Sequence, residues 1–229
     1  MNQIRAILLS GGTGSRMGGD IPKQFLPLHG KPLLLHSVER FKKWGATKSL
    51  TVVSHPDWIL KTEDILKGIL DIDDRIVEGG ETRHLSTLAG INSFSFDETD
   101  LVCIHDVARP NFRLVELDRL VEETRIYGAA TLVAHITESL LHSQKGTNYS
   151  EKSLDREEVY SVKTPQMASG HLLKKLLENP VSLDLGKHPT DLASWIQPHK
   201  IGLVTSDHTN LKVTHPGDIK LLEEMGLID

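Results

Sequence analysis

Short apolar runs alternate with longer amphipathic segments along most of the chain. The runs are too continuously apolar to alternate inward and outward, as expected of strands buried on both faces of a parallel sheet. The expected strands are residues 4–9, 50–53, 75–77, 101–104, 131–134 and 201–204, and the expected helices are residues 33–44, 57–70, 82–94 and 115–127. This alternation predicts right-handed βαβ units. It therefore predicts an α/β, Rossmann-like fold, with a mostly parallel, twisted sheet flanked by helices.

The pattern changes after about residue 135. Residues 137–161 are polar, and this stretch is longer than most connections in compact domains. Weak strand periodicity returns at residues 158–162, which favours an extended, hairpin-like arm. We therefore expect one domain over residues 1–229, with a protruding arm at about residues 137–161.

The last part of the chain returns to regular patterns. Helical spacing marks residues 171–177 and 191–196, and residues 210–214 have the pattern of a strand. A helix is expected from Pro216, because Thr214 suits the N-cap and Asp218 suits the positive end of a helix.

Composition and charge exclude several classes of protein. The 229 residues carry 26 Lys and Arg against 31 Asp and Glu, so the formal net charge of −5 gives no global basic field for nucleic acid or an anionic membrane. The single cysteine, Cys103, excludes an intrachain disulfide framework and a multi-cysteine zinc site. No apolar stretch reaches the length of about 18 residues that a spanning helix needs. We expect a cytoplasmic protein with no nucleic-acid or membrane partner.

A glycine-rich loop follows the first expected strand directly, since residues 9–18 read LSGGTGSRMG. Glycines let the backbone approach a ligand, so that successive N–H groups point at phosphate oxygens. Arg16 and Lys23 add positive charge within reach of the same oxygens. The spacing matches neither a dinucleotide fingerprint nor a Walker A loop. These residues favour phosphate binding over a plain strand-to-helix turn.

A second polar motif, HDVARP at residues 105–110, follows the expected strand at residues 101–104. Ligands of parallel sheets bind beyond the carboxyl ends of the strands, so Asp106 should lie beside the phosphate site. A carboxylate there can hold Mg²⁺ or meet hydroxyls of a substrate, and Arg109 can bind a phosphate. The alternative is that Asp106 and Arg109 simply pair and stabilise the loop.

Taken in order, five motifs resemble the cytidylyltransferases of polyol phosphates. They are the glycine-rich loop, PKQFL at 22–26, EGGETR at 78–83, HDVARP at 105–110 and NLKVT at 210–214. The closest resemblance, over residues 4–225, is to the 2-C-methyl-D-erythritol 4-phosphate cytidylyltransferase family. It implies the nucleotide-diphospho-sugar transferase fold and an enzyme that joins CTP to a polyol phosphate and releases pyrophosphate, in isoprenoid precursor synthesis.

The resemblance also implies a role for particular residues toward CTP. Arg16, Lys23 and Lys212 would stabilise the transition state on the phosphate oxygens. The residues expected to bind the nucleotide are Ser10, Gly11, Gly12, Gly14, Gly79, Gly80, Glu81, Ser86 and Asp106. Mg²⁺ is the expected cofactor, with Asp106 as its protein ligand.

For the acceptor, the resemblance implies a homodimer whose arms cross to the neighbouring subunit. Asp106 and Arg109 would bind the acceptor, together with Ser139, Arg156 and Thr164 from the partner. Glu138, Leu141 and Thr209 depart from the family pattern near this pocket. Two alternatives therefore stay open: a ribitol 5-phosphate cytidylyltransferase, and a catalytically silent nucleotide-binding homologue.

Overall fold

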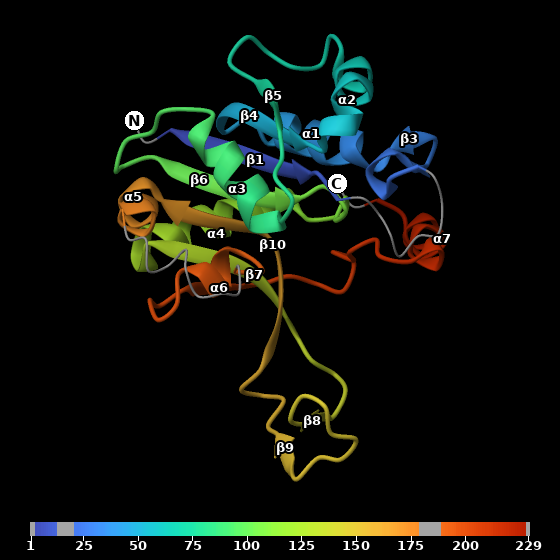
Figure 1. Ribbon diagram of the computed structural model, residues 1–229, viewed down its shortest axis with the longest axis vertical. Helices are drawn as coiled ribbons and strands as arrows, with labels where there is room; N and C mark the ends of the chain where they lie inside the picture. The colour runs from blue at the N-terminus through green and yellow to red at the C-terminus, as the bar shows by residue number, and fades with distance from the viewer. Residues whose placement is uncertain (1–2, 13–20, 179–188, 228–229) are drawn as a thin grey trace.

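The computed structural model describes residues 3–12, 21–178 and 189–227 (Figure 1). In this part of the chain, one large sheet runs in the order β11-β7-β10-β6-β1-β4-β5. The strands are β1 (Ile4–Ser10), β4 (Thr47–Ser54), β5 (Arg75–Glu78), β6 (Leu101–Asp106), β7 (Ala129–His135), β10 (Tyr160–Ser169) and β11 (Gly202–Thr205). All six runs predicted as buried strands lie in this sheet, which confirms the α/β fold class.

One strand runs against the others. β10 pairs antiparallel with both β6 and β7, whereas β1, β4, β5, β6, β7 and β11 pair in parallel. The weak strand expected at residues 158–162 is the start of β10, which continues to Ser169. The antiparallel β10 leads from the arm back into the middle of the sheet, between β6 and β7.

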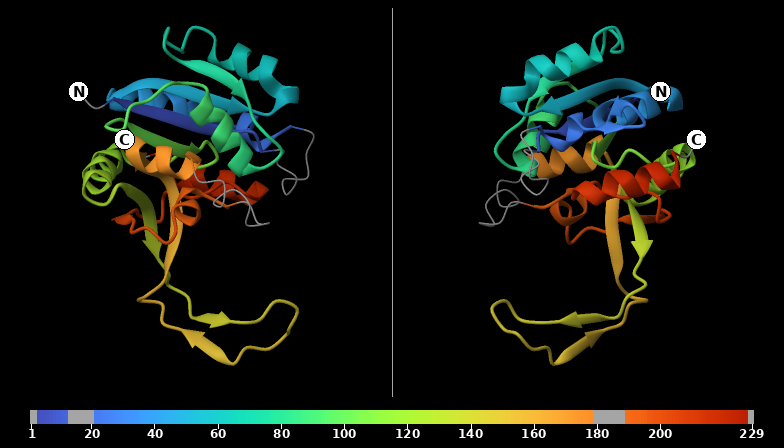
Figure 2. Two further views of the ribbon diagram at one scale, coloured as in Figure 1. Left: turned by 60° about the vertical axis from the view of Figure 1, so that its left-hand side comes forward. Right: turned by 90° about the vertical axis from the view of Figure 1, so that its right-hand side faces the viewer.

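Helices cover both faces of the sheet, as the two views of Figure 2 show. Helices α1 (Leu33–Trp44), α2 (Ile59–Leu66) and α4 (Leu114–Tyr127) pack on one face, and α3 (Arg83–Asn92), α5 (Gly170–Glu178) and α6 (Leu192–Trp195) pack on the other. Because successive residues of a strand point to opposite faces, Ala6 and Leu8 of β1 join the first core and Ile7 and Leu9 join the second. This explains why the strand runs are apolar at nearly every position.

The expected strand at residues 210–214 is wrong. The segment is irregular and forms no strand ladder: the Val213 amide donates to the Ala108 carbonyl at 2.8 Å, in the loop after β6. Helix α7 (Pro216–Met225) begins as expected at Pro216, but its N-cap is His215 rather than Thr214. The cause is Asp218, whose carboxylate accepts from the backbone amides of Thr214 and His215.

Two small hairpins complete the fold. β2 (Pro27–Leu28) and β3 (Lys31–Pro32) pack beside α7 through the buried Leu28, Val213 and Leu222. β8 (Leu140–His142) and β9 (Lys152–Leu154) form the antiparallel end of the arm, which projects away from the sheet (Figures 1 and 2). Within the described residues, every helix is too short or too polar to cross a membrane.

Candidate active site

A cavity of about 510 Å³ opens at the carboxyl ends of β1, β4, β5 and β6. Parallel strands end at the same edge, so loops far apart in the sequence meet there. The cavity is lined by Leu9, Ser10, Gly11, Gly12, Lys23, Gln24, His55, Pro56, Gly79, Gly80, Glu81, Thr82, Arg83, Ser86, Asp106, Val107, Ala108 and Lys212. It therefore gathers expected residues from all five motifs.

The glycine-rich loop forms one wall of the cavity. Ser10, Gly11 and Gly12 line it, while Gly14 and Arg16 lie outside the described residues. Gln24 fixes the start of the loop: it is almost fully buried and donates from Nε2 to the Ser10 carbonyl at 2.7 Å. A buried amide that fixes the end of β1 keeps the following backbone N–H groups at the cavity edge.

Two further glycines form a second wall at the end of β5. A Cβ on Gly79 would lie 2.8 Å from Ser86 Oγ, and a Cβ on Gly80 would lie 2.5 Å from Leu85 Cβ. Ser86 Oγ also donates to the Gly80 carbonyl at 3.2 Å. Glu81 continues this wall. At Gly79 and Gly80 a side chain has no room against Ser86 and Leu85, so glycine is required for the turn to pack this closely on α3.

Asp106, the last residue of β6, is the electrostatic centre of the cavity. Its Oδ2 lies 2.6 Å from Lys212 Nζ, and its Oδ1 accepts from Arg83 Nε at 2.8 Å. Burial by itself raises the pKa of the Asp106 carboxyl, but the charges of Arg83 and Lys212 outweigh it and hold the pKa below its usual range. Asp106 is thus ionised at neutral pH.

Among the described residues, a third cation of the cavity is Lys23, in the 3-10 turn η2 (Lys23–Phe25). Its Nζ donates to the Val213 carbonyl at 2.9 Å, in the segment that also carries Lys212. Lys23, Arg83 and Lys212 therefore reach the cavity from three separate elements. Such a set of cations can bind a polyphosphate and withdraw charge from it.

The expected acceptor residues are divided between two places. Thr164 is buried in β10, where its Oγ1 accepts from the Asp106 amide at 3.1 Å, and Arg109 donates from Nη1 to the Asn210 carbonyl at 3.1 Å. Neither lines the cavity, but both contact segments that do. Ser139 and Arg156 are exposed on the arm, away from the cavity of their own chain, and Arg156 Nη1 donates to the Thr137 carbonyl.

Arg83 is a site residue that was not predicted from the sequence. Arg83 lies in the first turn of α3, where Thr82 is the N-cap, and its Nη1 also donates to the Thr190 carbonyl at 3.3 Å. It ends the EGGETR motif, so the motif was found while the role of its last residue was not. Gln24 and His55 also line the cavity without having been expected there.

Glycine turns and three cations at the carboxyl edge of an α/β sheet define a nucleotidyltransferase-type protein, and solved structures share the fold. The structure of 2-C-methyl-D-erythritol 4-phosphate cytidylyltransferase from Francisella tularensis matches with a TM-score of 0.82 and 25% identity, covering 98% of this chain and all of that one. The 4-diphosphocytidyl-2C-methyl-D-erythritol synthase from Anaerococcus prevotii has the same TM-score at 22% identity, covering 98% of each chain.

Sequence comparison identifies the family within this class. The model of the 2-C-methyl-D-erythritol 4-phosphate cytidylyltransferase family matches residues 4–225. A protein of that name from Leptospira interrogans is 44% identical over 223 residues, which cover 96% of this chain and 91% of the relative. A chloroplastic one from Oryza sativa is 33% identical, covering 97% and 74%. The chain belongs to the 2-C-methyl-D-erythritol 4-phosphate cytidylyltransferase family, which confirms the resemblance.

Proposed function

We propose that this protein transfers the cytidylyl group of CTP to 2-C-methyl-D-erythritol 4-phosphate and releases pyrophosphate, a step of isoprenoid precursor synthesis. The observation that carries the proposal is the cavity. It brings together residues 10–12, 23, 79–81, 86, 106 and 212, the positions that the family resemblance assigns to CTP. Membership of the family over residues 4–225 supports the same reaction.

In this reaction an oxygen of the acceptor phosphate attacks the α-phosphorus of CTP. A new phosphorus–oxygen bond forms, and the bond to the oxygen that bridges the α- and β-phosphates breaks, so that pyrophosphate leaves with both electrons of that bond. The attacking phosphate is already an anion near neutral pH, so no general base is needed. The site has to position two polyanions in line and stabilise the charge of the transition state. Lys23, Lys212 and Arg16 are proposed for this task.

The nucleotide is proposed to bind between the two glycine walls. The backbone of Gly11, Gly12 and Gly14 would hold the triphosphate. The cytosine would lie against Gly79, Gly80, Glu81 and Ser86. Gly79 and Gly80 line the cavity and carry no side chain, which supports recognition of the base by their backbone N–H and C=O groups.

The acceptor is proposed to bind at Asp106 and Arg109. Thr164, expected from the partner, accepts from the Asp106 amide of its own chain, so we propose it for the site of that chain. Ser139 and Arg156 would come from the arm of a partner subunit, so the proposed enzyme is a homodimer. The arm supports this proposal because it projects from the sheet and exposes apolar side chains, with Leu141 70% and Tyr149 62% exposed. Apolar side chains on an extended arm are stabilised when a second chain covers them.

Mg²⁺ is the proposed cofactor. Among the described residues no group of three or more His, Cys, Asp or Glu side chains could hold a metal, and Asp106 is the carboxylate that we propose as the protein ligand. One carboxylate together with substrate phosphates is a usual environment for Mg²⁺, and the ionised state of Asp106 fits it. When bound, the ion would neutralise charge on the triphosphate. We also propose a reducing compartment such as the cytoplasm, since the single cysteine, Cys103, is a buried free thiol.

The test is pyrophosphate release by the purified protein with CTP and Mg²⁺, comparing 2-C-methyl-D-erythritol 4-phosphate with ribitol 5-phosphate. Turnover with the first acceptor supports the proposal. Turnover with ribitol 5-phosphate alone would establish the alternative acceptor, which the family match does not favour. CTP binding without turnover on either acceptor would identify a catalytically silent homologue.

A further inference from the structure

Three positive side chains donate to three carbonyl oxygens of one irregular segment, residues 206–214. Lys163 Nζ donates to the Asp207 carbonyl at 2.9 Å, and Lys23 Nζ donates to the Val213 carbonyl at the same distance. Between them, Arg109 Nη1 donates to the Asn210 carbonyl at 3.1 Å. The segment follows β11 and carries Lys212 to the carboxylate of Asp106.

These bonds matter because the segment belongs to no helix or strand until α7 begins at Pro216. A backbone without ladder bonds keeps its position only through its side-chain and loop contacts. Lys212 depends on that position, because its ammonium must lie at a fixed place beside Asp106 to act on a phosphate.

Two of the three cations have a second role in the proposed reaction. Lys23 is assigned to the phosphates of CTP and Arg109 to the phosphate of the acceptor. A phosphate competes with the neutral carbonyl for such a cation, because charge-assisted bonds to phosphate are the stronger. Substrate binding would therefore weaken two of the three charged bonds to the segment just when Lys212 is needed, although the Val213 amide still donates to the Ala108 carbonyl and the Asn210 side chain to the Thr164 carbonyl.

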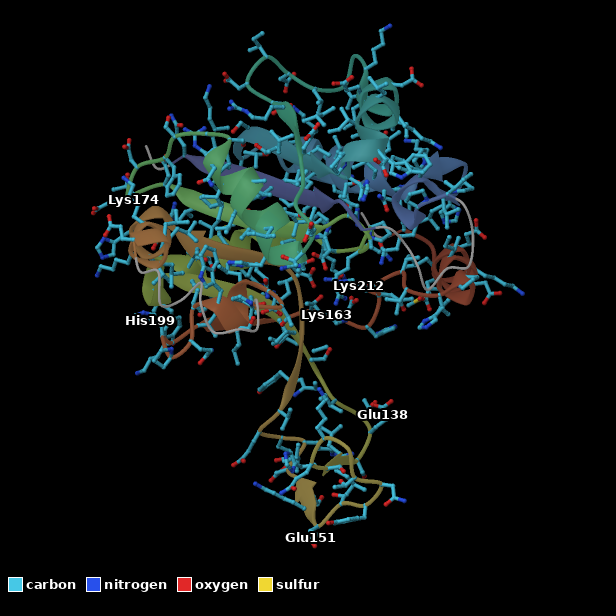
Figure 3. The ribbon with its side chains drawn as sticks, viewed as in Figure 1. Glu138, Glu151, Lys163, Lys174, His199 and Lys212 are labelled. Atoms are coloured by element: carbon cyan, nitrogen blue, oxygen red, sulfur yellow. The ribbon has the colours of Figure 1, made fainter. Side chains whose placement is uncertain are left out.

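Lys163 is different from the other two. It lies in β10, where Figure 3 labels it, is only 8% exposed, and is not among the residues that line the cavity. The nearest acid, Asp207, has its carboxylate engaged by Arg113 at 2.7 Å and by Thr209, so the Lys163 ammonium is held by the Asp207 carbonyl. A buried ammonium on a main-chain carbonyl loses hydration without gaining an ion pair, an arrangement that stability alone does not favour.

We propose that Lys163 is a positioning residue for Lys212. It holds the segment at Asp207 through the whole reaction cycle, while substrate phosphates compete with the segment carbonyls for Lys23 and Arg109. The inference rests on the proposed function and adds to it a residue for which the family resemblance gives no role. It also explains why β10 carries a lysine next to Thr164: Lys163 bonds the segment of Lys212, and Thr164 bonds the amide of Asp106.

The first experiment is a double-mutant cycle on pyrophosphate release. Lys163→Met keeps the length of the side chain and removes the donor, and we expect kcat to fall at least about tenfold with less than about a twofold change in KM for CTP. In the Lys212→Ala background the same substitution should change kcat less than about twofold, because the residue through which Lys163 acts is gone. Lys163→Arg should restore most of the activity, and Lys200→Met, at an exposed lysine, is the matched control.

Equal losses from Lys163→Met in both backgrounds would overturn the proposal, because they would mean that Lys163 acts independently of Lys212. So would a change confined to KM.

A second measurement does not depend on activity. Amide hydrogen exchange of peptides covering residues 206–214 should be faster in Lys163→Met than in the wild-type protein, while the strands β1 and β6 keep their protection. Unchanged exchange would overturn the proposal that Lys163 holds residues 206–214, even if the enzyme is active. If exchange is faster but the protein turns over neither acceptor, the proposed function fails. The positioning of residues 206–214 by Lys163 would still stand.

Discussion

Lys212 Nζ lies 2.6 Å from Asp106 Oδ2, although 106 positions separate the two residues. The Lys212 side chain is 33% exposed and that of Asp106 is 11% exposed, so the carboxylate is fixed in the wall while the ammonium reaches the cavity. Because the pKa of Asp106 is held low against its burial by Arg83 and Lys212, the contact is an ion pair at neutral pH. The structure thus keeps a positive charge at the place where a phosphate would bind.

Lys212→Met should remove that charge and leave the fold intact, since Asp106 keeps Arg83 as a partner. We expect kcat for pyrophosphate release to fall by about 10² to 10³, the usual loss for one preorganised donor to a transition-state oxygen. Steady-state kinetics with thermal unfolding as the check on folding would measure it. Lys220→Met, at an exposed lysine of α7, is the control and should behave as wild type. Near wild-type turnover in Lys212→Met would show that Lys212 has no catalytic role.

Asp106→Asn tests the proposed metal site. An amide keeps the shape of the carboxylate and loses its charge, so Mg²⁺ would be held by substrate phosphates with weaker help from the protein. We expect chelation to abolish pyrophosphate release in the wild-type enzyme and the half-saturating Mg²⁺ concentration to rise about tenfold or more in the variant. Asp64→Asn, at an exposed acid of α2, is the control. An unchanged Mg²⁺ titration would argue against Asp106 as the ligand.

Strand patterns predicted most of the sheet because β1, β4 and β6 are buried on both faces and are therefore apolar at successive positions. For β10 the strand pattern indicated only the start of the strand and not its continuation to Ser169. Its buried residues include Lys163, Thr164 and Gln166, whose polar groups are satisfied inside the fold; Gln166, for example, accepts from the Leu192 amide and donates to Thr131. A polar strand bonded in this way has the sequence pattern of a loop.

Gly80→Ala tests the close approach of the backbone at the second wall. The new Cβ would lie 2.5 Å from Leu85 Cβ, so the turn or α3 must shift. We expect a loss of about 1 to 3 kcal/mol in the free energy of unfolding, as for other overpacked sites, together with a higher KM for CTP. Gly217→Ala is the matched control, because a Cβ there meets nothing within 4 Å. Denaturant unfolding and steady-state kinetics measure both effects. If the two variants behave alike, the turn at Gly80 accommodates a Cβ without cost.

His105 should make stability depend on pH. It is fully buried between Phe41 and Phe112, and burial lowers its pKa from an ordinary value of 6.5 to about 3. Between these values the unfolded chain binds a proton that the folded chain does not, so the free energy of unfolding falls as the pH drops. One such proton contributes a slope of up to about 1.4 kcal/mol per pH unit.

Urea unfolding at pH 7, 6 and 5 would measure that slope. His105→Gln should be less stable than the wild-type protein at pH 7, yet its stability should depend less steeply on pH. His199→Gln, at an exposed histidine, controls for the loss of an imidazole. Parallel slopes for the wild-type and His105→Gln proteins would show that His105 takes up its proton in the folded state.

The motifs located the candidate site better than they assigned roles within it. Ser10, Gly79 and Lys212 could be placed at one cavity because the carboxyl ends of parallel strands share an edge. Arg83 could not be assigned in the same way. Its partner Asp106 is 23 residues away, and only the packing of α3 against the sheet brings the two charges together. Pairings between loops of this kind are set by the tertiary fold and have no periodic signal in the sequence.

The homodimer and the role of the arm can be tested together by mixing two inactive variants. If Arg156 serves the partner's site, a dimer of one Lys212→Ala subunit and one Arg156→Ala subunit contains one site with both defects and one intact site. Random pairing makes half of the dimers mixed, so co-expression of the two variants should recover about a quarter of wild-type activity, as expected for an interface that shares residues between two-fold-related sites. Each variant alone should stay nearly inactive, and differently tagged subunits allow the mixed dimer to be isolated and assayed.

If Arg156 instead serves the site of its own chain, each site of the mixed dimer carries one defect, and its activity should be no more than the mean of the two parents. That result would place Arg156, and with it the arm, outside the partner's acceptor pocket.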